Sequence, residues 1–208
     1  MTLEVILKEK RNPIPMYAKN IDSVMPAKDQ PVGFDFEKGD WVAPYGNGIN
    51  TDMALTYSEQ QATDSSWRRY GFQVAFPNTG GGAYIRKKDT FSTYHSDHEA
   101  NDTGEYVPSF TFVYERTDDK VTQDIKVDTG TYLVFRTRTV TDSNGKILEA
   151  HYGKIYGPLN FARGPEKRVS FTYYFNPTPN DRNIEFDPKQ NLSKPTDRND
   201  HSVGVAKP

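Results

Sequence analysis

The strongest local pattern in the chain runs from Gly130 to Tyr156 and reads GTYLVFRTRTVTDSNGKILEAHYGKIY. Two runs of β-forming residues lie on either side of Asn144-Gly145. Asn-Gly tolerates the positive φ angles of a tight turn, and the flanking Val, Ile, Thr, Tyr and Phe suit a pleated, half-buried surface. The segment therefore predicts a β-hairpin, and this hairpin restricts the chain to folds that contain an antiparallel sheet.

A turn of two or four residues would fix which hairpin residues share a face of the sheet. The face that we expect to point into the core holds Leu133, Phe135, Thr137, Thr139, Leu148, Ala150, Tyr152 and Tyr156. The opposite face holds Val134, Arg136, Arg138, Val140, Ile147, Glu149, His151, Gly153 and Ile155. There, Arg136, Arg138 and His151 are candidates for binding an anionic or sugar ligand, with cross-strand charge pairing on a solvated face as the alternative. A three-residue turn with a bulge would shift this assignment.

Period-two alternation of apolar residues recurs along the rest of the chain. Between Trp67 and Phe76 it places Tyr70, Phe72 and Val74 on one face of a half-buried strand. Similar short runs, separated by turn residues, indicate nine to eleven strands, and no long helical pattern supplies the crossovers of a parallel α/β sheet. We therefore predict an all-β fold, an antiparallel two-sheet β-sandwich that is jelly-roll-like and has little or no helix.

The 208 residues suit one domain. We expect residues 1–186 to form a single β-sandwich domain. Within it, residues 11–33 contain four prolines and are expected to be an extended loop that wraps over the domain. Residues 187–208 contain no aromatic residue and are mostly polar, which predicts a disordered tail.

Composition narrows the possible functions. The 13 Tyr and 12 Phe supply an aromatic core, and a net charge of -2 gives no basic footprint for nucleic acid. The absence of cysteine excludes disulfides, thiolate metal sites and cysteine nucleophiles. No apolar run is long enough to cross a bilayer. The start MTLEVILKEKRNP lacks the apolar run of a signal peptide, but short Tyr- and Thr-rich strands with long polar loops are typical of exported modules, so we expect a periplasmic, cell-surface or extracellular protein.

No catalytic motif is recognisable. Thr79-Gly80-Gly81-Gly82 lacks the Gly-Lys-Ser/Thr ending of a phosphate-binding loop, so it predicts the tip of a hairpin. No Gly-x-Ser-x-Gly elbow is present. Glycoside hydrolysis needs two carboxyl groups across a cleft, and the sequence does not show which of its 28 acidic residues face one another.

The densest cluster of potential metal ligands lies between His95 and Glu105. The imidazoles of His95 and His98 suit a transition metal. Carboxylate and amide oxygens suit calcium, and they come from Asp97, Glu99, Asn101 and Asp102. Neither spacing matches a defined motif, so a solvated acidic loop is the alternative. We therefore expect no cofactor, with calcium as the alternative if the loop binds one.

Aromatic residues beside turns offer a second route to ligand binding. Trp41, Tyr45, Trp67 and Tyr84 occupy such positions, where rings can stack on the faces of pyranose sugars or close the ends of a sandwich core. We therefore expect a non-catalytic binding or structural β-module of an exported or surface-associated protein, with carbohydrate as the ligand. A glycan-active hydrolase that uses loop carboxylates, a protein–protein assembly module with an exposed edge strand, and a cytoplasmic cupin-like metal enzyme are the alternatives.

Overall fold

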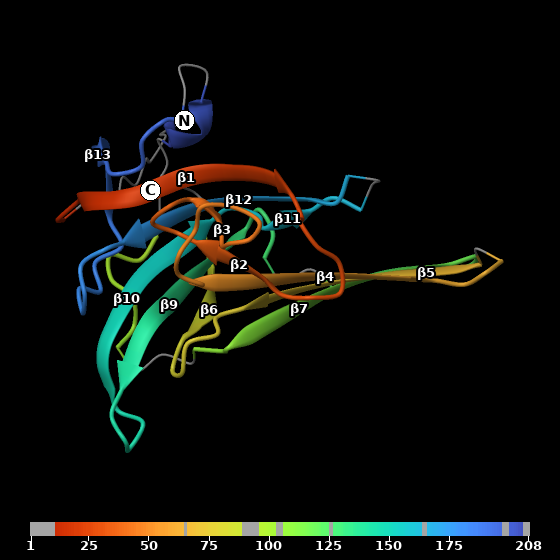
Figure 1. Cartoon of the computed structure of the whole chain (residues 1–208), viewed down its shortest axis with the longest axis horizontal. Coiled ribbons are helices and arrows are strands. Elements are labelled where there is room, and N and C mark those ends of the chain that lie inside the picture. Colours follow the sequence, from red (N-terminus) through yellow and green to blue (C-terminus); the bar gives the residue numbers. More distant parts are fainter. Residues whose placement is uncertain are drawn as a thin grey trace, which may run out of the picture.

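Two β-sheets pack face to face in the computed structural model (Figure 1). The structure describes residues 11–64, 66–88, 96–102, 106–124, 127–163, 166–196 and 200–205. Strands make up 55% of the described residues, and the one helical turn among them is a 3-10 turn, η1 (His201–Val203). None of the described helical segments could cross a bilayer. The predicted all-β sandwich with two largely antiparallel sheets is therefore confirmed.

The first sheet has seven strands in the order β13-β1-β12-β10-β9-β6, with β11 beside β12. Its members are β1 (Ile14–Val24), β6 (Gly82–Lys87), β9 (Thr131–Thr141), β10 (Ile147–Tyr156), β11 (Asn160–Phe161), β12 (Arg168–Asn176) and β13 (Phe186–Asn191). Neighbouring strands run antiparallel except β1 and β13, which are parallel.

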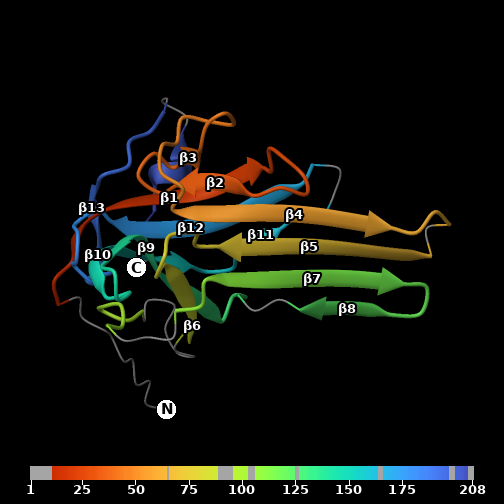
Figure 2. The ribbon, with the colours of Figure 1, turned by 60° about the horizontal axis from the view of Figure 1, so that its bottom comes forward.

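The second sheet has six antiparallel strands in the order β3-β2-β4-β5-β7-β8. Its members are β2 (Val32–Asp35), β3 (Asp40–Trp41), β4 (Met53–Gln61), β5 (Trp67–Ala75), β7 (Ser109–Thr117) and β8 (Val121–Asp124). Strands β4, β5, β7 and β8 extend beyond the end of the first sheet, as Figures 1 and 2 show. We call this extension the arm.

The core between the sheets is built from aromatic rings. Phe36, which follows β2, stacks on Phe135 of β9 with their ring centroids 4.5 Å apart. Phe34 of β2 meets Phe171 of β12 edge to face at 5.4 Å. All four side chains are buried, and burying each contributes about 1.5–3 kcal/mol. Replacing Phe135 with alanine would cost about 3–5 kcal/mol because the neighbouring rings cannot fill the space.

The turn of the β9–β10 hairpin does not have the two or four residues on which the predicted division of the two sheet faces is based. Gly145 has a φ of 81°, its N–H donates to the Asp142 carbonyl, and the Asp142 N–H donates to the Lys146 carbonyl. This is a three-residue turn with a bulge, so odd residues of β9 pair with odd residues of β10, except at an irregularity where Glu149 lies opposite Val140. Leu133 consequently lies opposite Ile155.

The predicted core face is therefore right for Leu133 and Phe135 and wrong for most of β10. Ile155 packs in the core between the sheets. The three aromatic or small residues predicted for that core lie instead in a second cluster on the outer face of the sheet: Ala150, Tyr152 and Tyr156. Leu148 is 55% exposed. Gly153 also faces inward, because a Cβ there would lie 2.4 Å from the Phe135 ring.

Two segments expected to lack strands contribute strands to the first sheet and residues to the second cluster. The segment expected to be a wrapping loop contains β1, and Pro15 is accommodated because it lies at a register shift between β1 and β13. The segment expected to be a disordered tail contains β13, and Val205 beyond it is buried in the same cluster. The Asn191 side chain holds β13 in place by accepting from the Ala18 N–H and donating to the Ala18 carbonyl.

Residues 79–82 are not a hairpin tip. They connect β5, in the second sheet, to β6, in the first. Gly80 has a φ of 81°, which favours glycine at this change of direction.

Candidate functional site

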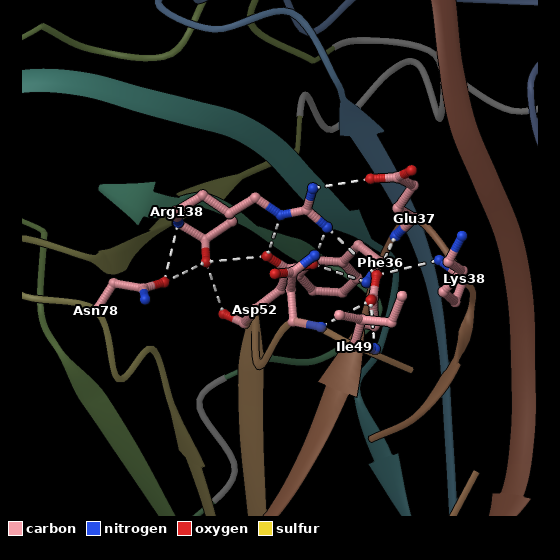
Figure 3. Close-up of polar contacts among 10 residues, drawn as sticks. Phe36, Glu37, Lys38, Ile49, Asp52, Asn78 and Arg138 are labelled. Carbon is pink, nitrogen blue, oxygen red and sulfur yellow. Dashed lines mark hydrogen bonds and ion pairs between the residues drawn. The ribbon is translucent and has the colours of Figure 1, made fainter. Parts of the chain in front are cut away.

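Arg138 lies at the centre of an ion-pair network between the two sheets (Figure 3). Its Nε and Nη2 donate to the two carboxylate oxygens of Asp52 at 2.8 and 3.0 Å, and its Nη1 donates to Glu37 at 2.9 Å. Nη2 also lies 3.3 Å from a carboxylate oxygen of Asp35. Because Arg138 comes from β9 and the carboxylates come from or beside β2 and β4, the network ties one sheet to the other.

The two buried carboxylates of this network, Asp35 and Asp52, each accept several hydrogen bonds from the protein. Asp35 accepts the backbone N–H groups of four residues, Glu37, Lys38, Ile49 and Asn50. Burial acts to raise the pKa of Asp35, but these donors lower it below its ordinary value. Burial raises the pKa of Asp52 above its ordinary value, although Arg138 opposes this. We therefore assign Arg138 a structural role rather than the predicted ligand-binding one.

His151 is a buried neutral imidazole. It lies opposite Thr137, is 8% exposed, and meets the Phe175 ring edge to face at 5.8 Å. Neither ring nitrogen has a hydrogen-bond partner within the described residues. Burial and the nearby Arg138 charge lower its pKa from 6.5 to about 4. A side chain that is buried and uncharged near neutral pH does not attract anions.

Arg136 does not take part in the Arg138 network and makes its own contacts. Its Nε donates to the Gly80 carbonyl at 2.9 Å, and its guanidinium carbon lies 4.1 Å from the centroid of the Tyr106 ring. The structure thus does not bring Arg136, Arg138 and His151 together as one binding patch.

The four candidate stacking aromatics lie in four separate environments. Trp41 is buried in the core, where its Nε1 donates to Ser23. Tyr84 is buried in the second cluster. Trp67 is half-buried at the outer end of the arm, and Tyr45 is 40% exposed in the loop after β3. The structure therefore does not form a stacking platform from these rings.

The acidic segment around residue 98 is neutralised by arginines. Asp97 accepts from Arg86 at 2.9 Å, and the Asn101 side chain accepts from the same guanidinium at 3.3 Å. Glu99 lies 3.5 Å from Arg182. Of the other residues considered for metal binding, His98 pairs with Glu185, Asp102 is exposed, and His95 and Glu105 lie outside the described residues. In the described ranges no three His, Asp or Glu side chains lie close enough to share a metal ion.

A different site lies on the inner face of the arm. Alternate residues of β5 and β7 share this face, and they lie opposite one another in three rows. From the sandwich outward the rows are Phe72 with Phe112, Tyr70 with Tyr114, and Arg68 with Arg116. The surface thus changes from apolar to phenolic to cationic along the arm.

Two adjoining cavities make this face a groove. The inner cavity has a volume of about 210 Å³ and is lined mainly by Phe72, Phe112, Leu159 and Phe161. The outer cavity has a volume of about 350 Å³. Tyr70, Tyr114 and Arg163 line both, so the two cavities are continuous. Phe161 of β11 stacks on Phe72 at 4.9 Å and closes the inner end.

The groove carries an excess of positive charge. Arg68, Arg116 and Arg163 line it, and Asp118 is the one acid among its described lining residues. Within the described chain none of these three guanidinium groups forms an ion pair. Arg68 donates to neutral groups, the Tyr70 hydroxyl and the Gln61 side chain. Their charges therefore remain available to an anionic ligand.

Sequence reasoning did not identify these arginines. The alternation that places Tyr70 on the core face also places Arg68 there, and Tyr114 and Arg116 follow the same rule. What the sequence does not reveal is the register that brings the two strands together.

No family model matches the chain, and no curated protein or solved structure matches it either.

Proposed function

We propose that the chain is a non-catalytic binding module that holds an acidic carbohydrate in the groove of the arm. The observation that carries this proposal is the row of guanidinium groups without carboxylate partners beside the phenol rings of Tyr70 and Tyr114. An arginine fork binds a carboxylate or sulfate through paired hydrogen bonds, and an aromatic ring packs against the apolar face of a sugar. The groove offers the guanidinium groups together with the half-buried ring of Tyr114, which carries Arg163 on one face, whereas Tyr70 is buried.

The charge of the groove favours binding over hydrolysis. Glycoside hydrolysis uses two carboxyl groups on either side of the sugar, whereas Asp118 is the one acid among the described lining residues. Glu59, at the base of the arm, is occupied by Lys167 at 3.4 Å and by the Tyr57 hydroxyl at 2.9 Å. We retain the expectation of an exported or surface-associated protein as part of the proposal, since acidic polysaccharides are accessible to such a module.

Isothermal titration calorimetry with oligouronates, sulfated oligosaccharides and neutral oligosaccharides of matched length tests this proposal. We expect the acidic ligands to bind and the neutral ones to bind at least about tenfold more weakly, since each charged hydrogen bond contributes about 1.5–3 kcal/mol. Binding should also weaken as salt is raised, because the arginine heads are exposed.

A matched pair of variants locates the site. Arg68→Gln removes a guanidinium from the groove, whereas Arg69→Gln removes one from the opposite face of the same strand, where Arg69 lies opposite Glu115. We expect Arg68→Gln to weaken acidic ligands about tenfold and Arg69→Gln to leave their affinity unchanged. Equal losses in both variants, or equal affinity for neutral and acidic sugars, would contradict the proposal.

A further inference from the structure

The outer edge of the arm is an open strand edge. Strand β8 ends the six-stranded sheet, and all four of its residues are exposed. The Thr117 N–H donates to the Lys120 carbonyl at 2.8 Å, so these residues form the first hydrogen-bonded pair of the β7–β8 hairpin. Pairs alternate in an antiparallel ladder, so Thr122 and Asp124 bond to β7. The backbone N–H and C=O groups of Val121 and Gln123 therefore point outward, away from the sheet.

The other terminal strands are protected in ways that β8 is not. On β6, Ala83 exchanges both backbone hydrogen bonds with Val107. Strand β13 contains Pro188, which cannot donate to a further strand, and β3 is two residues long. In the part of the chain that the structure describes, no segment pairs with the outer side of β8. An unprotected edge of this kind is a template for another strand.

We propose that β8 pairs antiparallel with β8 of a second copy of this chain, about a two-fold axis at Thr122. In this register Val121 of one copy lies opposite Gln123 of the other, and both have their backbone groups directed outward. Each of the two symmetry-related pairs then exchanges both of its N–H···O bonds. The strand is thus complementary to itself in its backbone geometry.

The side chains are complementary in the same register. Lys120 of one copy lies opposite Asp124 of the other, and the two-fold axis repeats this pair. Directly opposed residues of opposite charge stabilise a sheet, particularly at positions between the hydrogen-bonded pairs, where side chains are closest. Val121, which is 56% exposed in the single chain, becomes partly covered.

The shape of the molecule permits this contact. The arm projects away from the sandwich, and β8 lies along its outer edge (Figure 2). Because β8 pairs with the outer half of β7, antiparallel pairing overlaps only the outer halves of the two arms and directs the two sandwiches away from each other. Two six-stranded sheets become one continuous sheet.

The pairing stands without the proposed function, but it would extend that function. Val121 and Gln123 share the inner face of the arm with Arg116 and Tyr114, which lie opposite them on β7. The two grooves would therefore adjoin on one face of the dimer. A polymeric ligand could occupy both, and its avidity would exceed the affinity of one groove.

Sedimentation velocity over a micromolar to millimolar concentration series tests the pairing. We expect a reversible monomer–dimer equilibrium. Gln123→Pro removes an outward N–H from each copy without disturbing the bonds to β7, whereas the control Gln123→Ala keeps it. The proline variant should dimerise at least about tenfold more weakly than the alanine variant. A wild-type chain that is monomeric throughout, or equal dimerisation of these two variants, overturns the proposal.

A charge swap tests the register. Lys120→Glu places a glutamate opposite Asp124 of the other copy, so it should weaken the dimer. Combining Lys120→Glu with Asp124→Lys places opposite charges there again and should restore the dimer. Failure of the double variant to recover would overturn the register centred on Thr122, provided that thermal melts show both variants folded. Binding of a short oligouronate to the monomeric Gln123→Pro variant is measured separately, so the loss of pairing is distinguishable from a failure of the groove.

Discussion

The guanidinium carbon of Arg163 lies 3.7 Å from the centroid of the Tyr114 ring. Arg163 follows β11 of the first sheet, and Tyr114 belongs to β7 of the second, so this contact spans the groove between the sheets. A guanidinium group stacks flat on an aromatic ring while its edge N–H groups remain exposed to a ligand. The contact therefore holds a cation in place on an aromatic surface.

Replacing Arg163 with lysine should show how much of the ligand binding depends on the planar guanidinium group and how much on its positive charge. Lysine keeps the positive charge but loses the planar stacking and the paired donors. We expect Arg163→Lys to weaken an oligouronate by about three- to tenfold and Arg163→Gln to weaken it further, with little effect on unfolding. Titration calorimetry and urea denaturation measure the two quantities. A lysine variant that binds as tightly as the wild type would show that the stacked geometry is unimportant.

Removing Arg138 should destabilise the sandwich. Arg138→Met leaves the buried carboxylate of Asp52 without its cation, and removing one partner of a buried ion pair costs about 3–5 kcal/mol. Adding Asp52→Asn should recover part of this loss, because it removes one uncompensated charge. Urea unfolding of the single and double variants gives both values. If the two substitutions lower the free energy of unfolding additively in the double variant, the ion pair between Arg138 and Asp52 would be contradicted.

His151 should make stability depend on pH in a defined window. Its pKa is lowered from 6.5 in an unfolded chain to about 4 in the folded protein, so the unfolded chain binds more protons between these values. Stability is therefore expected to fall as the pH drops through this window, by up to about 3 kcal/mol. The free energy of unfolding of the wild type and of His151→Phe, measured across the window, checks this. The variant should show a flatter profile, and identical profiles would exclude His151 as the cause.

The Asn191 side chain should anchor the C-terminal strand. Asn191→Ala loses the two hydrogen bonds to Ala18 and leaves buried backbone groups of β1 without these partners, at a cost of about 1–3 kcal/mol. Gln190→Ala is the matched control, because Gln190 is exposed and bonds only to Asp187 among the contacts described. Thermal melts compare the two variants. Equal midpoints would mean that β13 contributes little to the fold.

The sequence predicts the fold class because period-two alternation is a local property. Tyr70, Phe72 and Val74 alternate within one strand, and the structure places all three on a buried face. The parity of the β9–β10 hairpin is harder to predict, because Asn144-Gly145 suits turns of different lengths and one added residue reverses every face.

The candidate site depends on pairings between distant residues. Arg68 and Arg116 become neighbours only through the register of β5 and β7, and Arg163 reaches them from the other sheet. Likewise, Asp52 and Arg138 are separated by 86 residues. Burial of Ala150 on the outer face depends on segments at both ends of the described chain, including Met16 and Phe186. Single-strand patterns contain no information on such contacts.

The position of β1 has a consequence for how the protein is made. Both strands that flank β1 come from the last part of the described chain, β12 beginning at Arg168 and β13 ending at Asn191. A chain emerging from the ribosome therefore exposes β1 without either neighbour until β12 has been translated. Contacts between such distant segments form slowly, and unpaired strand edges associate with other chains in the meantime. The first sheet is completed only once β12 and β13 have been translated, so chaperone protection of β1 until that point should govern the yield of folded protein.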